Sequence, residues 1–340
     1  MRIGKVTESV LKRSVLKLIK SDSNRESAAA KSDCAYSIDE DGSVLLSSVS
    51  TMTVKTDEAG FFAVHNAANN VFCMGGKPTM AVLNILLAAD AEESELKNVM
   101  RSAINAANDL GIAIEGGHTE VTDAVERTVV SAIVTGISKA KSNSKALEKD
   151  DKTFLNNIEG KLKDSCDIII TKWIALEGTA ILAANEADKL KGRLPDYMIK
   201  EAAGYKRLVS VKNDAQIALS SGALMTHDVS MGGIFAALWD ISERAGCGME
   251  VDLKKIPIRQ ETVEITNYLG LNPYQMISGG SLLIIAPDGD RVVRSLEDAG
   301  INATIIGVTT NKNDKIIRNE DEIRYLDKPM ADEILKINNY

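Results

Sequence analysis

Residues 92–120 read EESELKNVMRSAINAANDLGIAIEGGHTE and contain a helix pattern followed by a strand pattern. Apolar residues recur at helical spacing up to Gly111, which stands where a left-handed residue commonly ends a helix. A short strand is expected over 112–114, and Gly116-Gly117 then predicts a turn with exposed backbone N–H groups. This stretch predicts a fold in which helices and strands alternate.

The same alternation continues on both sides of this stretch. Helical spacing predicts helices over 5–20, 60–74, 178–190, 213–221, 234–245, 261–269 and 291–299. Apolar or alternating runs predict strands over 44–50, 79–88, 127–137, 166–171, 248–253, 281–286 and 303–308. Polar stretches over 21–33 and 138–165 predict loops, the first of them mobile without ligand. We therefore predict an α+β domain over 1–150 and an α/β domain over 151–340.

Composition excludes several classes of function. The chain has 340 residues, a net charge of −8 and 44% hydrophobic residues, which indicates a globular protein too long for one core. The acidic balance argues against nucleic acid as the main partner, and no apolar run is long enough to span a membrane. The 4 cysteines are widely spaced, which excludes a disulfide framework or zinc site and favours a reducing cytoplasm.

Two glycine pairs could carry chemistry. Gly116 and Gly117 lie beside His118 and Thr119, so backbone N–H groups, a hydroxyl and an imidazole come together where phosphate oxygens could bind. An ordinary β-turn explains these residues better on local sequence alone.

The second pair, Gly232-Gly233, follows Asp228 in the predicted loop 226–233 and opens a helix. Free N–H groups at a helix start bind anions, although a simple capping loop again explains the pattern better. Asp33, just before a strand, is a candidate metal ligand or a solvated turn residue, and His65 is interpreted as a core histidine.

Several stretches in this order resemble the aminoimidazole-ribonucleotide (AIR) synthase-like superfamily, and the branch they are most similar to is that of the hydrogenase maturation protein HypE. The stretches are MRIGKVTESVLKRSVL at the start, GGHTEVTDAVERTVVSAIVTGI at 116–137, KWIALEGTAILA at 172–183, THDVSMGGIFAALWDISERAG at 226–246 and IPIRQETVEITNYLGLNPYQMISGGSLLI at 256–284. The resemblance covers the chain from Arg2 to about Thr310 and is specific only when the stretches are taken together.

The resemblance implies a homodimer in which strands of two N-terminal domains, over 35–137, close a barrel. It also implies that ATP and Mg²⁺ bind in a cleft, with the phosphates held by glycine-rich segments and carboxylates. By that reading, the cofactor-binding residues are Ser50, Asn70, Gly116, Gly117, His118, Thr119, Asp228, Gly232 and Gly233, and Asp33 is the metal ligand. No catalytic residue is assigned.

The chain departs from the family pattern at the metal site. The family has consecutive acids where this chain has Ser32-Asp33, and it has carboxylates at the positions of Ser50 and Asn70. Ser230-Met231 replaces a Thr-Glu or Thr-Arg pair before Gly-Gly. HypE also ends in a cysteine that accepts a carbamoyl group, and no cysteine follows Cys247 here.

Two hypotheses follow. In one, the protein is an ATP-dependent enzyme that performs phosphoryl-transfer or dehydration-type chemistry on an unidentified substrate. In the other, it is a catalytically degenerate homodimer with a binding or regulatory role and a maturation-type protein partner. Because two expected carboxylates are neutral, we expect weak ATP binding that is largely independent of Mg²⁺.

Overall fold

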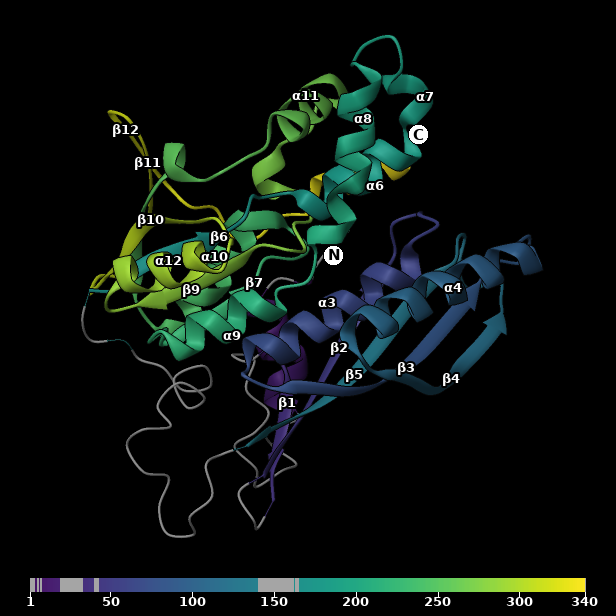
Figure 1. Ribbon diagram of the computed structural model, residues 1–340, viewed down its shortest axis with the longest axis horizontal. Coiled ribbons are helices and arrows are strands. Elements are labelled where there is room, and N and C mark those ends of the chain that lie inside the picture. The colour runs from purple at the N-terminus through teal and green to yellow at the C-terminus, as the bar shows by residue number, and fades with distance from the viewer. Residues whose placement is uncertain are drawn as a thin grey trace. The chain divides into compact units, whose positions relative to one another are not determined.

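The computed structural model describes residues 4, 6, 8–18, 33–39, 43–139, 162 and 165–339 (Figure 1). The chain divides into two compact units. Residues 33–144 and 335–340 form one, here called the N-terminal unit, and residues 1–32 and 145–334 form the other, called the C-terminal unit. The boundary predicted at residue 150 lies outside the described residues, as does the predicted loop 21–33 apart from its last residue.

The N-terminal unit is built on a five-stranded sheet with the order β1-β2-β5-β3-β4. Its strands are β1 (Ala35–Ile38), β2 (Ser43–Met52), β3 (Lys77–Leu87), β4 (Ala113–Val121) and β5 (Val129–Lys139). β3 and β4 pair in parallel, whereas the other neighbours are antiparallel. A parallel pair needs a crossover connection, and the helix between these two strands supplies it.

Two helices of this unit, α3 (Ala59–Cys73) and α4 (Glu93–Leu110), pack together (Figure 1). A Cβ atom on Gly60 would lie 2.4 Å from the carbonyl oxygen of Val99, so only glycine allows this approach of α3 to α4. Gly111 has the predicted left-handed conformation at the end of α4, with φ of 69°. Alternate residues of β2, including Val44 and Leu46, are buried, which leaves the intervening residues on the other face of the sheet.

The C-terminal unit contains a seven-stranded sheet with the order β12-β11-β8-β10-β6-β9-β7. Its strands are β6 (Asp167–Thr171), β7 (Met225–Asp228), β8 (Gly248–Asp252), β9 (Leu282–Ala286), β10 (Ala303–Thr310), β11 (Lys315–Asn319) and β12 (Glu322–Tyr325). All neighbours are antiparallel except β11 and β8. β9 reads LLIIA and is buried throughout, as expected of a strand covered on both faces.

Helices cover both faces of this second sheet. The helices of the unit are α6 (Leu176–Asn185), α7 (Ala187–Leu190), α8 (Asp196–Ala203), α9 (Lys212–Ser220), α10 (Gly233–Ala245), α11 (Gln260–Leu269) and α12 (Gly289–Asp298). Short 3-10 turns of the unit are η2 (Gly204–Leu208), η3 (Leu253–Lys255) and η4 (Pro273–Gln275), and most residues of a further turn, η5 (Glu333–Asn339), belong to the N-terminal unit. The apolar side of α10 shares one core with β6, β8 and β9, whereas α9 and α12 pack on the opposite face.

Near the start of the chain, α1 (Glu8–Leu11) continues as the π-helical turn η1 (Lys12–Leu16), within the range where a helix was predicted. All four cysteines are free and buried, in agreement with the predicted absence of a disulfide framework. In the C-terminal unit, one prediction of local structure was wrong and others were incomplete. Thr226–Asp228 belongs to β7 and not to a loop, and β11, β12 and α8 form from segments in which no element was predicted.

Candidate functional site

The predicted metal-site residues gather around the end of α3 in the N-terminal unit. Asn70 Nδ2 donates a hydrogen bond to Ser48 Oγ at 2.8 Å, and Ser50 follows two residues later on the same face of β2. Cys73 lies one helical turn after Asn70, and its Sγ is within 4.8 Å of a carboxylate oxygen of Asp33. The fold therefore brings Asp33, Ser50 and Asn70 to one region of the unit.

The chemistry of these donors does not fit magnesium. Mg²⁺ prefers oxygen ligands, usually carboxylates together with substrate phosphates and water. Among these residues of the N-terminal unit, Asp33 supplies one carboxylate, Cys73 supplies a soft thiol, and the Asn70 amide nitrogen already donates to a serine hydroxyl. The residues present here therefore do not fit a magnesium ion.

The segment Gly116–Thr119 lies within β4, which corrects the predicted turn. Its residues pair in parallel with Val82–Ile85 of β3. A Cβ on Gly117 would lie 2.1 Å from the Leu83 carbonyl oxygen, whereas Gly116 has open space. The glycine at 117 thus serves strand pairing, a role that its sequence neighbourhood did not reveal.

β4 is the end strand of its sheet and is exposed along nearly its whole length. His118 Nε2 and Glu120 Oε2 are 2.8 Å apart, with side chains 63% and 46% exposed, so the pair is solvated and weakly coupled. β5 and β3 separate β2 from β4 in the sheet order. At about 4.8 Å per strand, Ser50 and Gly116 lie roughly 14 Å apart across the sheet, so one chain does not bring them together.

In the C-terminal unit, the helix start at Gly232-Gly233 already has acceptors within the chain. Gly232 N donates to Asp332 Oδ2 at 2.6 Å, and Gly233 N donates to Ser230 O at 3.0 Å. This arrangement differs from the expectation that both N–H groups are open to phosphate. Asp228, at the end of β7, is 1% exposed and precedes this turn.

The Asp332 carboxylate occupies the start of α10, where its oxygen accepts the Gly232 N–H group. Its carboxylate is 2% exposed and also accepts a hydrogen bond from Ile334 N at 3.0 Å. Burial raises the pKa of Asp332 to about 6, and the backbone N–H groups of Gly232, Ile334 and Ile277 oppose that shift. The sequence carried no signal for this contact because 100 residues separate the two partners.

A second polar cluster that sequence reasoning missed surrounds the loop after β6. Lys172 and Ala175 have φ of 55° and 60°, a left-handed conformation that is unfavourable for residues with a side chain. Lys172 Nζ donates to Leu208 O at 3.1 Å and Ser210 O at 2.8 Å, and it pairs with Asp214. Burial lowers the pKa of Lys172, and Asp214 opposes that shift. This ion pair anchors a strained loop.

The segment 278–281 also holds the loop after β6 through hydrogen bonds. Ser278 Oγ accepts from Ala175 N at 2.6 Å, and Ser281 Oγ donates to Trp173 O at 2.6 Å. Glu177, which is fully buried, accepts from Gly279 N at 3.0 Å. Two segments quoted from the sequence, KWIALEG and ISGGSLL, therefore meet in space, which local patterns alone could not predict.

The AIR synthase related protein N-terminal domain model matches residues 29–138, and the corresponding C-terminal domain model matches residues 164–319. The chain belongs to the AIR synthase-related family. This assignment confirms the resemblance inferred from the sequence and its mixed α/β fold class.

Relatives of this AIR synthase-related chain include proteins of hydrogenase maturation. A Methanocaldococcus jannaschii protein named for hydrogenase expression and formation is 24% identical over 285 residues, or 82% of this chain and 79% of the relative. The solved HypE–HypF complex gives a TM-score of 0.71 at 18% identity and covers 93% of this chain and 100% of that chain. HypE in complex with ATP gives 0.68 at 17% identity, covering 98% and 97%. At this identity the structures establish the fold alone.

None of the helices in the described part of the chain combines the length and the apolarity that crossing a bilayer requires.

Proposed function

We propose that this AIR synthase-related chain is a HypE-like protein that binds adenine nucleotide weakly, with little dependence on Mg²⁺ and little turnover of ATP. In this proposal it acts as a catalytically degenerate homodimer with a binding or regulatory role. Support comes from relatives in hydrogenase maturation and from the ATP complex of a HypE of the same fold.

The hydrogen bond between Asn70 and Ser48 carries the proposal. A carboxylate at residue 70 would offer negative charge to a divalent ion, but Asn70 is neutral and its amide nitrogen is engaged by a hydroxyl at 2.8 Å. At an effective dielectric constant of about 20, each pair of unit charges 4 Å apart contributes roughly 4 kcal/mol before desolvation. Losing even a fraction of that energy at both residue 50 and residue 70 lowers the affinity for Mg²⁺ by orders of magnitude.

Nucleotide phosphates would then bind through backbone and neutral groups. In the N-terminal unit, Gly116–Thr119 supply the N–H groups on the side of β4 that β3 does not use, together with His118 and Thr119 side chains. In the C-terminal unit, a phosphate that used Gly232 would have to displace the Asp332 carboxylate. Nucleotide binding is therefore expected to be weak, because the phosphates would contact only backbone and neutral groups in one unit and would have to displace a carboxylate in the other.

The homodimer would form on the open face of the N-terminal sheet. Leu45, Val49, Met80 and Ile137 are 46%, 62%, 38% and 47% exposed, and strand pairing places them on this face. A patch of this kind is covered in solution by a partner, and a two-fold copy of the same face is the simplest one. Sedimentation is expected to show a dimer at micromolar concentration, and a stable monomer would contradict the proposal.

Calorimetric titration tests the nucleotide proposal. ATP binding to the unmodified protein is expected to be weak and equal with Mg²⁺ and with a chelator. The double variant Ser50→Asp with Asn70→Asp is expected to gain Mg²⁺-dependent affinity. The matched control is Ser94→Asp with Asn108→Asp, which adds the same charge at exposed positions. Tight ATP binding that vanishes on chelation of Mg²⁺ in the unmodified protein would refute the proposal.

The alternative is an active ATP-dependent enzyme with phosphoryl-transfer or dehydration-type chemistry. The observation that favours it is the retained carboxylate of Asp33 beside α3. Steady release of phosphate from ATP, abolished by Asp33→Asn, would support this alternative. A protein partner of the maturation type is a further part of both proposals, and its support is a solved complex of HypE with HypF.

A further inference from the structure

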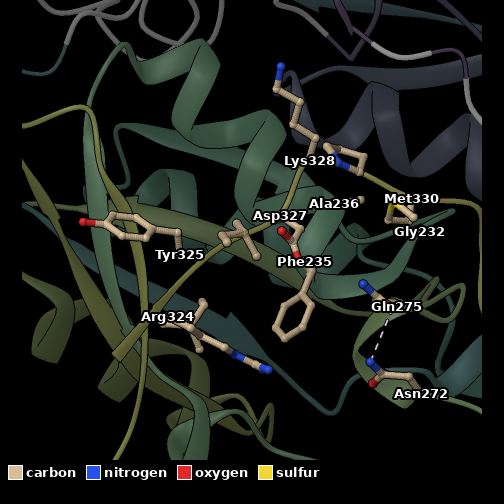
Figure 2. Close-up of a pocket in the computed structure, with 13 residues that line it drawn as sticks. Gly232, Phe235, Ala236, Asn272, Gln275, Arg324, Tyr325, Asp327, Lys328 and Met330 are labelled. Atoms are coloured by element: carbon tan, nitrogen blue, oxygen red, sulfur yellow. Dashed lines mark hydrogen bonds between the residues drawn. The ribbon is translucent and has the colours of Figure 1, made fainter. Parts of the chain in front are cut away.

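A cavity of about 230 Å³ lies within the C-terminal unit, and Gly232 is the one nucleotide-binding candidate among the residues that line it. It is bounded by the start of α10, by η4, by β11 and β12, and by residues 326–330 that follow β12 (Figure 2). Side chains of opposite character meet there, because Phe235 and Arg324 both line the cavity, whereas the ammonium of the lining residue Lys328 points away from them (Figure 2). Apart from Gly232, the residues that line it were not identified as a site by the sequence patterns or by the family resemblance.

The aromatic wall of the cavity is rigid. The Phe235 ring stacks on Tyr274 with centroids 5.4 Å apart and planes at 14°. Arg324 extends toward the same ring, with its guanidinium carbon 5.6 Å from the ring centroid (Figure 2). An aromatic surface beside a cation is favourable for a planar ligand, because such a ligand can contact both.

The residues that line the cavity carry a net positive formal charge. Arg324 and Lys328 line it, against the single carboxylate of Asp327. Within the described part of the chain, no carboxylate forms an ion pair with Arg324 or Lys328. An arginine without a carboxylate partner retains its planar donors for an incoming anion.

The polar walls are fixed by hydrogen bonds. Asn272 Oδ1 accepts from Tyr274 N at 3.1 Å, and Asn272 Nδ2 donates to Gln275 Oε1 at 3.4 Å (Figure 2). Leu326 N donates to Lys315 O at 2.7 Å, and Asp332 fastens the segment that follows to Gly232. The cavity is therefore formed before a ligand arrives, which lowers the entropic cost of binding.

We propose that this cavity binds a small planar aromatic anion, one ring that carries a carboxylate or a phosphate. Size limits the ligand: an apolar cavity of about 150 Å³ holds one benzene molecule. The 230 Å³ found here leaves room for one ring and an anionic group, but it is smaller than the roughly 300 Å³ of typical drug-sized sites. In the proposed pose, Phe235 contacts the ring and Arg324 binds the anion. The proposal does not rest on nucleotide binding.

Ligand-observed NMR with the full chain and four probes tests the proposal. Benzoate and phenyl phosphate carry both a ring and an anion, cyclohexanecarboxylate lacks the aromatic ring, and benzamide lacks the charge. We expect the first two to bind in the millimolar range and the other two to bind at least about fivefold more weakly. The stronger of benzoate and phenyl phosphate identifies the anionic group.

Single-residue variants test whether the probes bind in this cavity. Arg324→Gln is expected to weaken benzoate about tenfold. Phe235→Leu is expected to abolish the preference for benzoate over cyclohexanecarboxylate. Arg291→Gln, an exposed arginine on α12, is the matched control and should leave binding unchanged. If Phe235→Leu fails to fold, Arg324→Lys, at an exposed position, replaces it: it keeps the charge but loses the planar donors, and it should still weaken benzoate. Equal binding of the four probes, or benzoate affinity unchanged in Arg324→Gln, would overturn the proposal.

Discussion

His65 makes the N-terminal unit sensitive to acid. Its side chain is buried in α3 against Phe61, with ring centroids 4.4 Å apart. No described residue provides a hydrogen-bond partner for either ring nitrogen, and Asp109 Oδ2 is 3.9 Å from Nε2, too far for one. Burial lowers the pKa of His65 to about 4, and the charge of Asp109 opposes that shift without overcoming it.

The sign of the pH dependence follows from this shift. As pH falls, an unfolded chain protonates residue 65 near pH 6.5, whereas the folded chain does so only near pH 4. The free energy of unfolding is therefore fully retained above about pH 6.5 and decreases as the pH falls toward 4. With these two pKa values, the loss between pH 7 and pH 5 is about 2 kcal/mol, and it reaches about 3 kcal/mol below pH 4.

Urea unfolding at pH 7 and pH 5 measures the effect. His65→Leu removes the titrating ring, so its free energy of unfolding should fall by about 2 kcal/mol less between the two pH values than that of the unmodified protein. His118→Leu, at an exposed histidine on β4, is the control and should behave like the unmodified protein. Equal pH dependence of the His65→Leu and unmodified proteins, or an NMR titration of His65 near 6.5, would refute the reasoning.

Three further changes are informative. Gly117→Ala should destabilise the protein by about 1–3 kcal/mol because its Cβ meets a β3 carbonyl, whereas Gly116→Ala should be close to neutral; thermal unfolding of the two variants compares them. Lys172→Met should cost about 3–5 kcal/mol in urea unfolding by leaving Asp214 as an unpaired buried charge, and a cost below 1 kcal/mol would contradict this. Asp332→Ala should cost about 1–3 kcal/mol by leaving backbone N–H groups without their acceptor, and an unchanged urea midpoint would count against it.

Local patterns predicted the long elements well. The apolar stripe and terminal glycine predicted the helix observed as Glu93–Leu110, and alternation predicted the strand observed as Val129–Lys139. The start of β4 was predicted as a short strand over 112–114, but Gly116-Gly117 was interpreted as a turn because paired glycines usually serve turns. Here Gly117 is required because a neighbouring strand passes too close for a side chain, a tertiary constraint that is invisible in the segment itself.

The candidate site was predicted less completely. Asp33 was a candidate from local sequence, whereas Ser50 and Asn70 were identified only through the family resemblance, and the fold brings all three to one end of α3. The acceptor of Gly232 could not be predicted, because Asp332 is remote in sequence and is surrounded by ordinary charged residues. Long-range polar contacts of this kind depend on the completed fold.

The central position of β6 affects the order in which the two sheets form as the chain is made. All five strands of the N-terminal sheet lie between residues 35 and 139, so that sheet can assemble early. β6, in contrast, pairs with β9 and β10, and Asp167 accepts from Gly289 N, 122 residues later. At ribosomal rates of about 5–20 residues per second, β6 waits roughly 6–24 s for these partners. During that interval its apolar run Ile168–Ile170 is open to chaperones and to neighbouring nascent chains, so slower elongation should lower the yield of folded protein.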